Sequence, residues 1–283
     1  MNAREGRLIR ALIHDGRLRV IAVVADAACR EVVARHELRG RSAQLCAEGV
    51  VASLLLSAHI KGEERLMVQV QGQAPRLSFM ADVRPDGGFR ARLRPTWLPE
   101  GDSLSGTLMA AKWVGRKEIY RGAASLEESW ESSLQRFLTD SQQTLGMVKL
   151  LVGQGEDGVD FAAGLLVESV GGSGLDKEAF GGLVDSLQHA DLREVMTAFA
   201  FGQLLGSEVQ VLESRPVGLE CGDTRVRIER MLRSLGQTEL QAILDEQGEA
   251  EVTCDWCNDT VLVTGDRLQE LIEELQAGDS GRS

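Results

Sequence analysis

The sequence has no apolar run long enough to cross a bilayer. A spanning helix needs about 20 consecutive apolar residues, and the longest candidate, Val50–Ile60, is interrupted by two serines and a histidine. Arginine and aspartate break up the first residues, so they lack the apolar centre of a secretory signal peptide. We therefore expect a cytoplasmic protein that does not bind membranes.

Positive charge is scarce as well. The 283 residues include 31 Lys and Arg against 43 Asp and Glu, a formal net charge of −12, and residues 215–283 are markedly acidic. Affinity for nucleic acid comes mainly from Lys and Arg contacts with phosphates, so we expect no nucleic-acid partner. With 43% hydrophobic and 26% charged residues the chain is globular, and its length allows one large domain or two modest ones.

Cysteine is rare, and the common catalytic motifs are missing. Five cysteines do not make a disulfide framework, but three of them lie close together late in the chain, which indicates a metal or redox role. Cys29 and Cys46 lie among Ala and Leu in helix-like segments and are interpreted as core residues. No nucleophile elbow, phosphate-binding loop or zinc-protease motif is present, so we expect no enzyme.

One glycine pattern, Gly153–Gly158, fits the dinucleotide-binding consensus G-x-G-x-x-G. That site needs a helix to begin at the glycines, so that free N–H groups can bind the pyrophosphate. The residues that follow are strand-like, and Glu156 and Asp157 would repel phosphate. A hairpin turn is the better interpretation.

The apolar periodicity predicts an α+β fold with a mixed N-terminal α/β domain over residues 1–174. A long helix is expected over 42–60. Strands are expected at 18–24, 66–71, 77–83, 89–93, 104–114, 117–123, 147–152 and 159–167.

The pattern changes after the glycines at 171–174. Helical periodicity predicts a helical linker over 175–213, followed by a small zinc-binding-type module over 214–283. Within the module, two short strands, 249–253 and 260–263, are expected to form a hairpin around Cys254 and Cys257.

The C-x-x-C pair in this hairpin is the strongest chemical signal. Two thiolates in one turn can bind the same zinc ion, and Cys221 and Asp223 upstream could complete a set of three sulfurs and one carboxylate. An inert structural turn and a redox dithiol are the alternatives. Redox pairs of the thioredoxin type begin a helix after a strand, whereas this pair lies in a hairpin.

Four arginines form a basic stripe on the helix that follows Cys221. They are Arg225, Arg227, Arg230 and Arg233. We interpret the stripe as a solvated face, partly paired with Glu229 and neighbouring acids; a nucleic-acid contact is the alternative.

Several segments together resemble the 33 kDa chaperonin family, and the resemblance covers nearly the whole chain. In the C-terminal part they are 221–230, 235–236 and 248–257; in the N-terminal part they are 51–55, 68–72, 120–122 and 135–141. The family is a redox-regulated holdase, in which a C-x-C pair and a C-x-x-C pair bind one zinc ion through four thiolates. Oxidation forms two disulfides, expels the zinc and unfolds a helical linker, which exposes apolar surface to clients.

The resemblance implies that Cys221, Cys254 and Cys257 are zinc ligands, with Asp223 at the position of the fourth cysteine. Only the Cys254–Cys257 disulfide could then form of the family's two. We therefore expect an ATP-independent, redox-regulated holdase that binds one Zn²⁺ per chain and unfolded client proteins, with a homodimer as a possible active form. A thiol–disulfide oxidoreductase using Cys254 and Cys257 is one alternative, and a nucleic-acid-binding adaptor built on the zinc module is the other.

Overall fold

The chain forms two compact units, Met1–Glu220 and Cys221–Ser283. The computed structural model describes residues 6–13, 15–101, 103–142, 146–155, 158–170, 191, 193, 194, 196 and 208–280. Within these ranges, no helix combines the length and the hydropathy that crossing a membrane requires.

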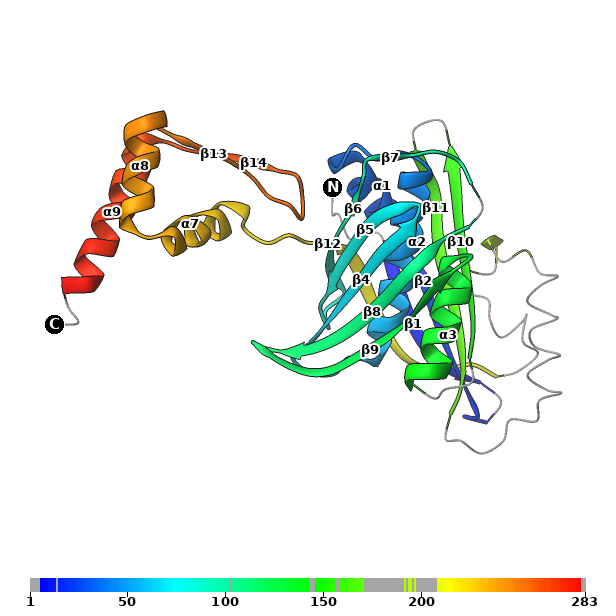
Figure 1. Cartoon of the computed structure of the whole chain (residues 1–283). Helices are drawn as coiled ribbons and strands as arrows, with labels where there is room; N and C mark the ends of the chain where they lie inside the picture. The colour runs from blue at the N-terminus through cyan, green and yellow to red at the C-terminus, as the bar shows by residue number, and fades with distance from the viewer. Residues whose placement is uncertain are drawn as a thin grey trace. The chain divides into compact units, whose positions relative to one another are not determined.

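The first unit is built on a ten-stranded sheet with the strand order β10-β11-β2-β1-β12-β6-β5-β4-β8-β9 (Figure 1). All neighbours are antiparallel except β12 and β6, which share a short parallel contact. The strands are β1 (Gly6–Ile13), β2 (Leu18–Val24), β4 (Glu64–Ala74), β5 (Arg76–Val83), β6 (Gly88–Arg94), β8 (Ser105–Val114), β9 (Lys117–Glu127), β10 (Gly146–Gly155), β11 (Gly158–Ser169) and β12 (Gln210–Leu219). A separate two-residue pairing joins β3 (Arg39–Gly40) to β7 (Trp97–Leu98).

The sheet curls around helix α2 (Arg41–Leu56), which is buried on almost every side (Figure 1). Its Ala- and Leu-rich sequence suits this position, because a helix surrounded by a core has no polar face. Gly49 marks the closest approach: a Cβ atom there would lie 2.7 Å from the rings of both Phe79 and Trp130. Helices α1 (Asp26–Arg35) and α3 (Trp130–Gln142) and the short 3-10 helix η1 (Ser57–His59) complete this unit.

A second apolar cluster lies on the other face of β1, β2, β10 and β11. Along β2, Ile21 and Val23 contribute to the core around α2, whereas Val20 and Ala22 contribute to the second cluster. A strand buried on both faces explains the continuous apolar run at 20–24. The members of the second cluster are Ile13, Leu18, Val20, Ala22, Met147, Phe161, Ala163, Leu165, Val167 and Met196.

The second unit is a small module of helices and one hairpin. Its elements are α7 (Thr224–Leu235), α8 (Gln237–Gln247), β13 (Ala250–Thr253), β14 (Thr260–Val263) and α9 (Gly265–Ser280). Eight buried side chains form its core: Ile228, Leu232, Leu240, Ala250, Val263, Leu268, Leu271 and Ile272. This core is small, so other interactions must contribute to the stability of the module.

The predicted α+β class and the hairpin around the C-x-x-C pair are confirmed. Residues 153–158 also form a hairpin, because β10 ends at Gly155, opposite the first residue of β11, Gly158. Most of the predicted linker, 175–213, lies outside the described residues. The helical prediction is wrong for 210–213, which belong to β12 because β1 provides a long-range strand partner. The boundary at residue 174 remains a prediction.

Candidate metal centre

Three cysteine sulfurs from two separate segments of the second unit come together. Cys221 lies just before α7, whereas Cys254 and Cys257 lie in the turn between β13 and β14. The three Sγ atoms lie within 4.8 Å of one another, and those of Cys221 and Cys254 are 3.9 Å apart. The folding of the module thus joins ligands that are more than 30 residues apart in the sequence.

The turn between the two strands is held by the backbone. The N–H of Cys254 donates to the carbonyl of Asp259 at 2.9 Å, and the N–H of Asn258 donates to the carbonyl of Cys254 at 2.8 Å. Asn258 has a φ of 57°, a left-handed conformation that asparagine tolerates better than most residues. These bonds fix the backbone that carries both sulfurs.

Hydrogen bonds and burial give the two hairpin thiols different acidities. Burial disfavours the Cys254 thiolate, but the N–H of Trp256, 3.4 Å from its sulfur, and further hydrogen bonds hold the pKa of Cys254 below its usual value. Burial raises the pKa of Cys257 to about 12, although the Thr224 hydroxyl lies 3.4 Å from its sulfur. One thiol of the pair is therefore predisposed to ionise before the other.

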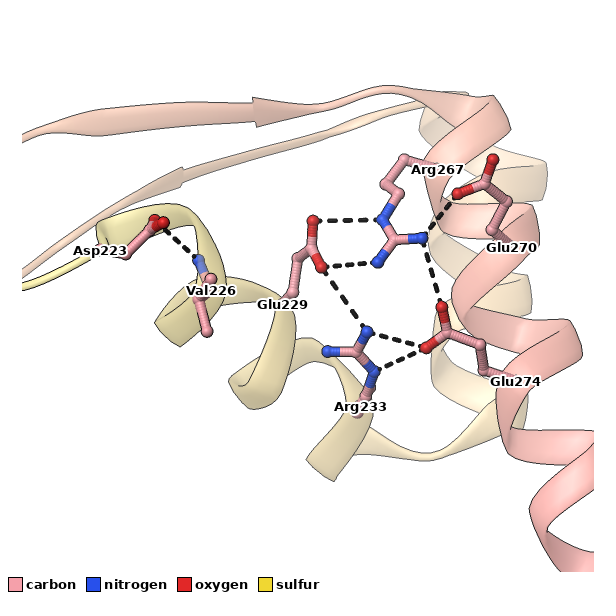
Figure 2. Close-up of polar contacts among 7 residues, drawn as sticks. All are labelled: Asp223, Val226, Glu229, Arg233, Arg267, Glu270 and Glu274. Carbon is pink, nitrogen blue, oxygen red and sulfur yellow. Dashed lines mark hydrogen bonds and ion pairs between the residues drawn. The ribbon is translucent and has the colours of Figure 1, made fainter.

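Asp223, the fourth predicted ligand, caps a helix. Its Oδ1 accepts a hydrogen bond of 3.1 Å from the N–H of Val226, which makes Asp223 the N-cap of α7 (Figure 2). Among the described residues, the group of potential metal ligands comprises the three sulfurs and no carboxylate. An N-cap aspartate satisfies a free N–H group and contributes about 1 kcal/mol to stability, so the structure gives this residue a role that needs no metal.

Ion pairs hold α7 against α9 (Figure 2). Arg267 makes a two-bond contact with Glu229, with Nε–Oε1 at 3.1 Å and Nη2–Oε2 at 2.7 Å. Arg233 contacts Glu274 at 2.8 Å, and Arg267 also contacts Glu270. Paired guanidinium and carboxylate forks of this kind are stronger and more specific than single ion pairs. They orient α7, whose first turns carry residues that touch the thiols.

The basic stripe on α7 divides into two groups. Arg225 and Arg230 are exposed, and Arg233 pairs with Glu229 at 3.6 Å, as the sequence indicated. Arg227 is different, because its Nη2 donates to the sulfurs of both Cys221 and Cys254, each at 3.1 Å. Sequence analysis missed this contact. The available signal was that Arg227 follows Cys221 by only six residues. The spacing of the four arginines, however, favoured a solvent-exposed side chain.

The other two cysteines lie in the first unit and are unsuited to metal binding or redox chemistry. Cys29 and Cys46 are fully buried in α1 and α2, and burial raises the pKa of both thiols, that of Cys46 to about 12. Thiols of this kind are inert, because the thiolate is the reactive form. Their interpretation as core residues is confirmed.

The chemistry of the remaining thiols fits a soft or borderline metal ion. Zinc is bound in proteins by cysteine thiolates at about 2.3 Å, and three thiolates that meet at one point form most of a tetrahedral set. The arrangement resembles a zinc site more than a thioredoxin-type pair, since Cys254 and Cys257 lie between two strands and not at the start of a helix.

Comparison with known proteins gives a consistent result. The family model described as Hsp33 protein matches residues 6–264. The chain belongs to the Hsp33 family. The 33 kDa chaperonin of Bacillus licheniformis is 27% identical over 287 residues, covering 95% of this chain and 99% of that protein. The 33 kDa chaperonin of Picosynechococcus is 28% identical, covering 96% and 98%.

A solved Hsp33 structure has the same fold. The crystal structure of the 33 kDa chaperonin (heat shock protein 33 homolog) from Thermotoga maritima matches with a TM-score of 0.83 at 18% identity, covering 96% of this chain and 99% of that one. The resemblance stated from the sequence is confirmed, and so is the interpretation of the chain as a redox-regulated chaperone of the Hsp33 family.

Proposed function

We propose that this Hsp33 chain is a cytoplasmic holdase that binds unfolded client proteins without ATP and without catalysing a reaction. Its partners are then unfolding proteins, and neither nucleic acid nor membranes. Its active form is a homodimer. The observation that carries the proposal is the cluster of three cysteine sulfurs, within 4.8 Å of one another, in a family of redox-regulated chaperones.

The second apolar cluster of the first unit supports a client-binding surface. Strands β2 and β11 have buried apolar side chains on this face as well as on the face toward α2. One member of this cluster, Met196, is fully buried and comes from the predicted linker. Arg193, from the same segment, lies over the Phe161 ring at 4.8 Å from its centroid. A segment that covers an apolar face can expose that face to clients when it unfolds.

We assign the control of this exposure to a zinc ion bound by Cys221, Cys254 and Cys257. Bound zinc would link the segment before α7 to the hairpin and so supply part of the folding free energy of the module. Asp223 is the sequence-based candidate for the fourth ligand. Its Oδ1 caps α7, which leaves Oδ2 as the oxygen without a role in the cap that could bind the metal.

Oxidation would remove two of the three thiolates. With hydrogen peroxide as the oxidant, one thiolate attacks the O–O bond to give a sulfenic acid and hydroxide, and a second thiolate attacks the sulfenic sulfur and displaces its oxygen as a second hydroxide to form the disulfide. We propose the Cys254–Cys257 bridge as the product. The remaining thiolate, Cys221, would be a weak zinc site by itself, so a bound zinc ion would be released.

The test of the function is the aggregation of a thermally unfolding client, followed by light scattering without ATP. The chain is expected to suppress aggregation at stoichiometric amounts, more strongly after peroxide treatment and zinc release than in the reduced, zinc-loaded form. Failure to suppress under reduced, oxidised and heated conditions would overturn the holdase proposal. Turnover of insulin disulfides would favour the oxidoreductase alternative, and salt-dependent binding of nucleic acid would favour the adaptor.

Truncating Met196 should raise the activity of the reduced protein. A buried methionine replaced by alanine loses about 2–5 kcal/mol of packing, and here the loss weakens the docking of the covering segment. We expect Met196→Ala to suppress client aggregation without oxidation and to increase the fluorescence of an apolar dye. Met231→Ala, at an exposed methionine in the other unit, is the matched control and should behave as the unchanged protein. Equal activity of the two variants would contradict the assigned surface.

A further inference from the structure

The side chain of Arg227 donates hydrogen bonds to both of the segments that carry the thiols. Its Nη2 lies 3.1 Å from the sulfur of Cys221 and 3.1 Å from the sulfur of Cys254, and Nη1 donates to the carbonyl of Cys221 at 2.5 Å. Nη2 also lies 3.5 Å from the Thr224 hydroxyl. A single planar guanidinium thus contacts two sulfurs whose residues are 33 positions apart.

The position of Arg227 is fixed from its own helix. It is half-buried in the second turn of α7, one residue before Ile228, which belongs to the module core. The same helix is held to α9 by the contacts of Glu229 and Arg233 shown in Figure 2. The guanidinium therefore reaches the sulfurs from a rigid element, whereas Arg225 and Arg230 on the same helix point into solvent.

The charges of the centre explain why a cation is needed there. Three thiolates carry three negative charges and a divalent metal ion neutralises two, so one remains. Cys254 and Cys257 are buried, and an uncompensated charge in a buried place is costly. The guanidinium neutralises the remaining charge, and its N–H groups can bond to sulfur lone pairs that the metal does not use. Such outer contacts orient metal ligands and typically change metal affinity by 10–100-fold.

We propose that Arg227 is a positioning residue of the metal centre: it holds the sulfurs of Cys221 and Cys254 together and balances the charge of a three-thiolate site. This inference rests on the metal centre of the proposed function. It assigns a specific task to Arg227 and none to the two exposed arginines of the basic stripe, Arg225 and Arg230.

The test measures zinc affinity of the full reduced chain by competition with a chromophoric chelator. Arg227→Gln should weaken zinc binding by about 10–100-fold. Arg227→Lys keeps the charge and loses the planar fork, so its zinc affinity should lie between that of the parent and that of Arg227→Gln. Arg230→Gln removes an exposed arginine from the same helix and should leave the affinity unchanged. The thiolate-to-metal absorption of the cobalt-loaded protein should shift in Arg227→Gln, since the hydrogen bonds to sulfur are lost.

Thermal unfolding of the metal-free proteins separates positioning from a purely structural role. We expect metal-free Arg227→Gln to unfold within a few degrees of the metal-free parent, so that the defect is confined to metal binding. The inference would be overturned if Arg227→Gln bound zinc within threefold of the affinity of the parent, or if its cobalt spectrum were unshifted. It would also be overturned if metal-free Arg227→Gln were already unfolded while Arg227→Lys bound zinc as the parent does. If the parent itself binds no zinc, the proposed metal centre fails first and the inference with it.

Discussion

Replacement of Cys254 by serine is expected to abolish tight zinc binding. Structural zinc sites contribute about 10–16 kcal/mol of apparent binding free energy, so the share of one thiolate is roughly 3 kcal/mol, or about 100-fold in affinity. Cys254 is the proposed ligand with the most contacts in the cluster, because its sulfur contacts that of Cys221 at 3.9 Å and accepts from N–H groups of Arg227 and Trp256. Its loss also removes one of the two sulfurs that Arg227 contacts and the sulfur that accepts from the N–H of Trp256.

The consequence for stability is as large as the loss of affinity. Zinc present at 100 times its dissociation constant stabilises the form that binds it by about 2.7 kcal/mol. The unfolding temperature of the parent module should therefore drop when a chelator is added, whereas that of Cys254→Ser should be insensitive to the chelator. Elemental analysis should find about one zinc per parent chain and far less in the variant.

Cys46→Ala provides the control for this experiment. It removes a thiol that is buried in α2 of the other unit, so it should retain the zinc content and the chelator sensitivity of the parent. A parent protein that takes up no zinc even when zinc is supplied in excess, although its C-terminal module is folded, would contradict the metal centre.

The sequence predicted the elements whose signals are local. The hairpin around Cys254 and Cys257 follows from two short apolar strands on either side of a turn, and α7 follows from its one-sided apolar stripe and the glycine that ends it, Gly236. The neighbouring strands expected at 77–83 and 89–93 were predicted for the same reason, and they are β5 and β6. The sequence signal of each of these elements lies within a few positions of the element itself.

Strand β12 was missed because its partner is distant. Gln210–Leu219 pairs with β1, about 200 residues earlier in the chain, and it contains Pro216, which weakens any strand signal. The pairing gives β12 a place in the middle of the sheet, between β1 and β6. Propensity in a short window cannot register a partner that only the complete fold supplies.

The candidate site was predicted in its residue types but not in its contacts. Spacing was enough to group Cys221, Cys254 and Cys257, and the structure brings their sulfurs together. Spacing could not show that the Asp223 carboxylate is used by the helix that begins after it. It also could not show that Arg227 faces the thiols. Arg230, one turn further along α7, is exposed, so the spacing of the arginines does not tell which of them contacts sulfur.

Asp223→Cys is expected to convert the site into one with four thiols. A fourth thiolate should tighten zinc binding by about 100-fold, the share of one ligand in a structural site. The substitution also removes the N-cap of α7, which costs about 1 kcal/mol. Asp223→Ser is the matched control, since serine caps helices as well as aspartate does but offers no carboxylate. If Asp223 acts only as a cap, Asp223→Ser should bind zinc as the parent does; if it is a ligand, affinity should fall.

Oxidation distinguishes the two sites by the number of bridges formed. The parent has five cysteines, and one bridge consumes two of them, so peroxide followed by alkylation in denaturant should leave three labelled thiols in the molecules whose Cys221 stays free. In Asp223→Cys, a second bridge can form between residues 221 and 223, so two labelled thiols should remain of six. Aggregation assays should then show a larger difference between reduced and oxidised protein in this variant, because the oxidised module retains no free thiolate to hold zinc.

Peptide mapping of the oxidised parent decides which thiols pair. We expect the Cys254–Cys257 bridge, within one turn, with Cys221 left free, further oxidised or cross-linked between chains. The 3.9 Å between the sulfurs of Cys221 and Cys254 makes the bridge between those two the competing product, since both bridges need Cys254. A Cys221–Cys254 bridge would tie the segment before α7 to the hairpin and hold the module together on oxidation, which is the opposite of a release switch. Finding it as the main product would contradict the proposed redox mechanism. Unchanged zinc affinity and bridge number in Asp223→Cys would place residue 223 outside the metal site.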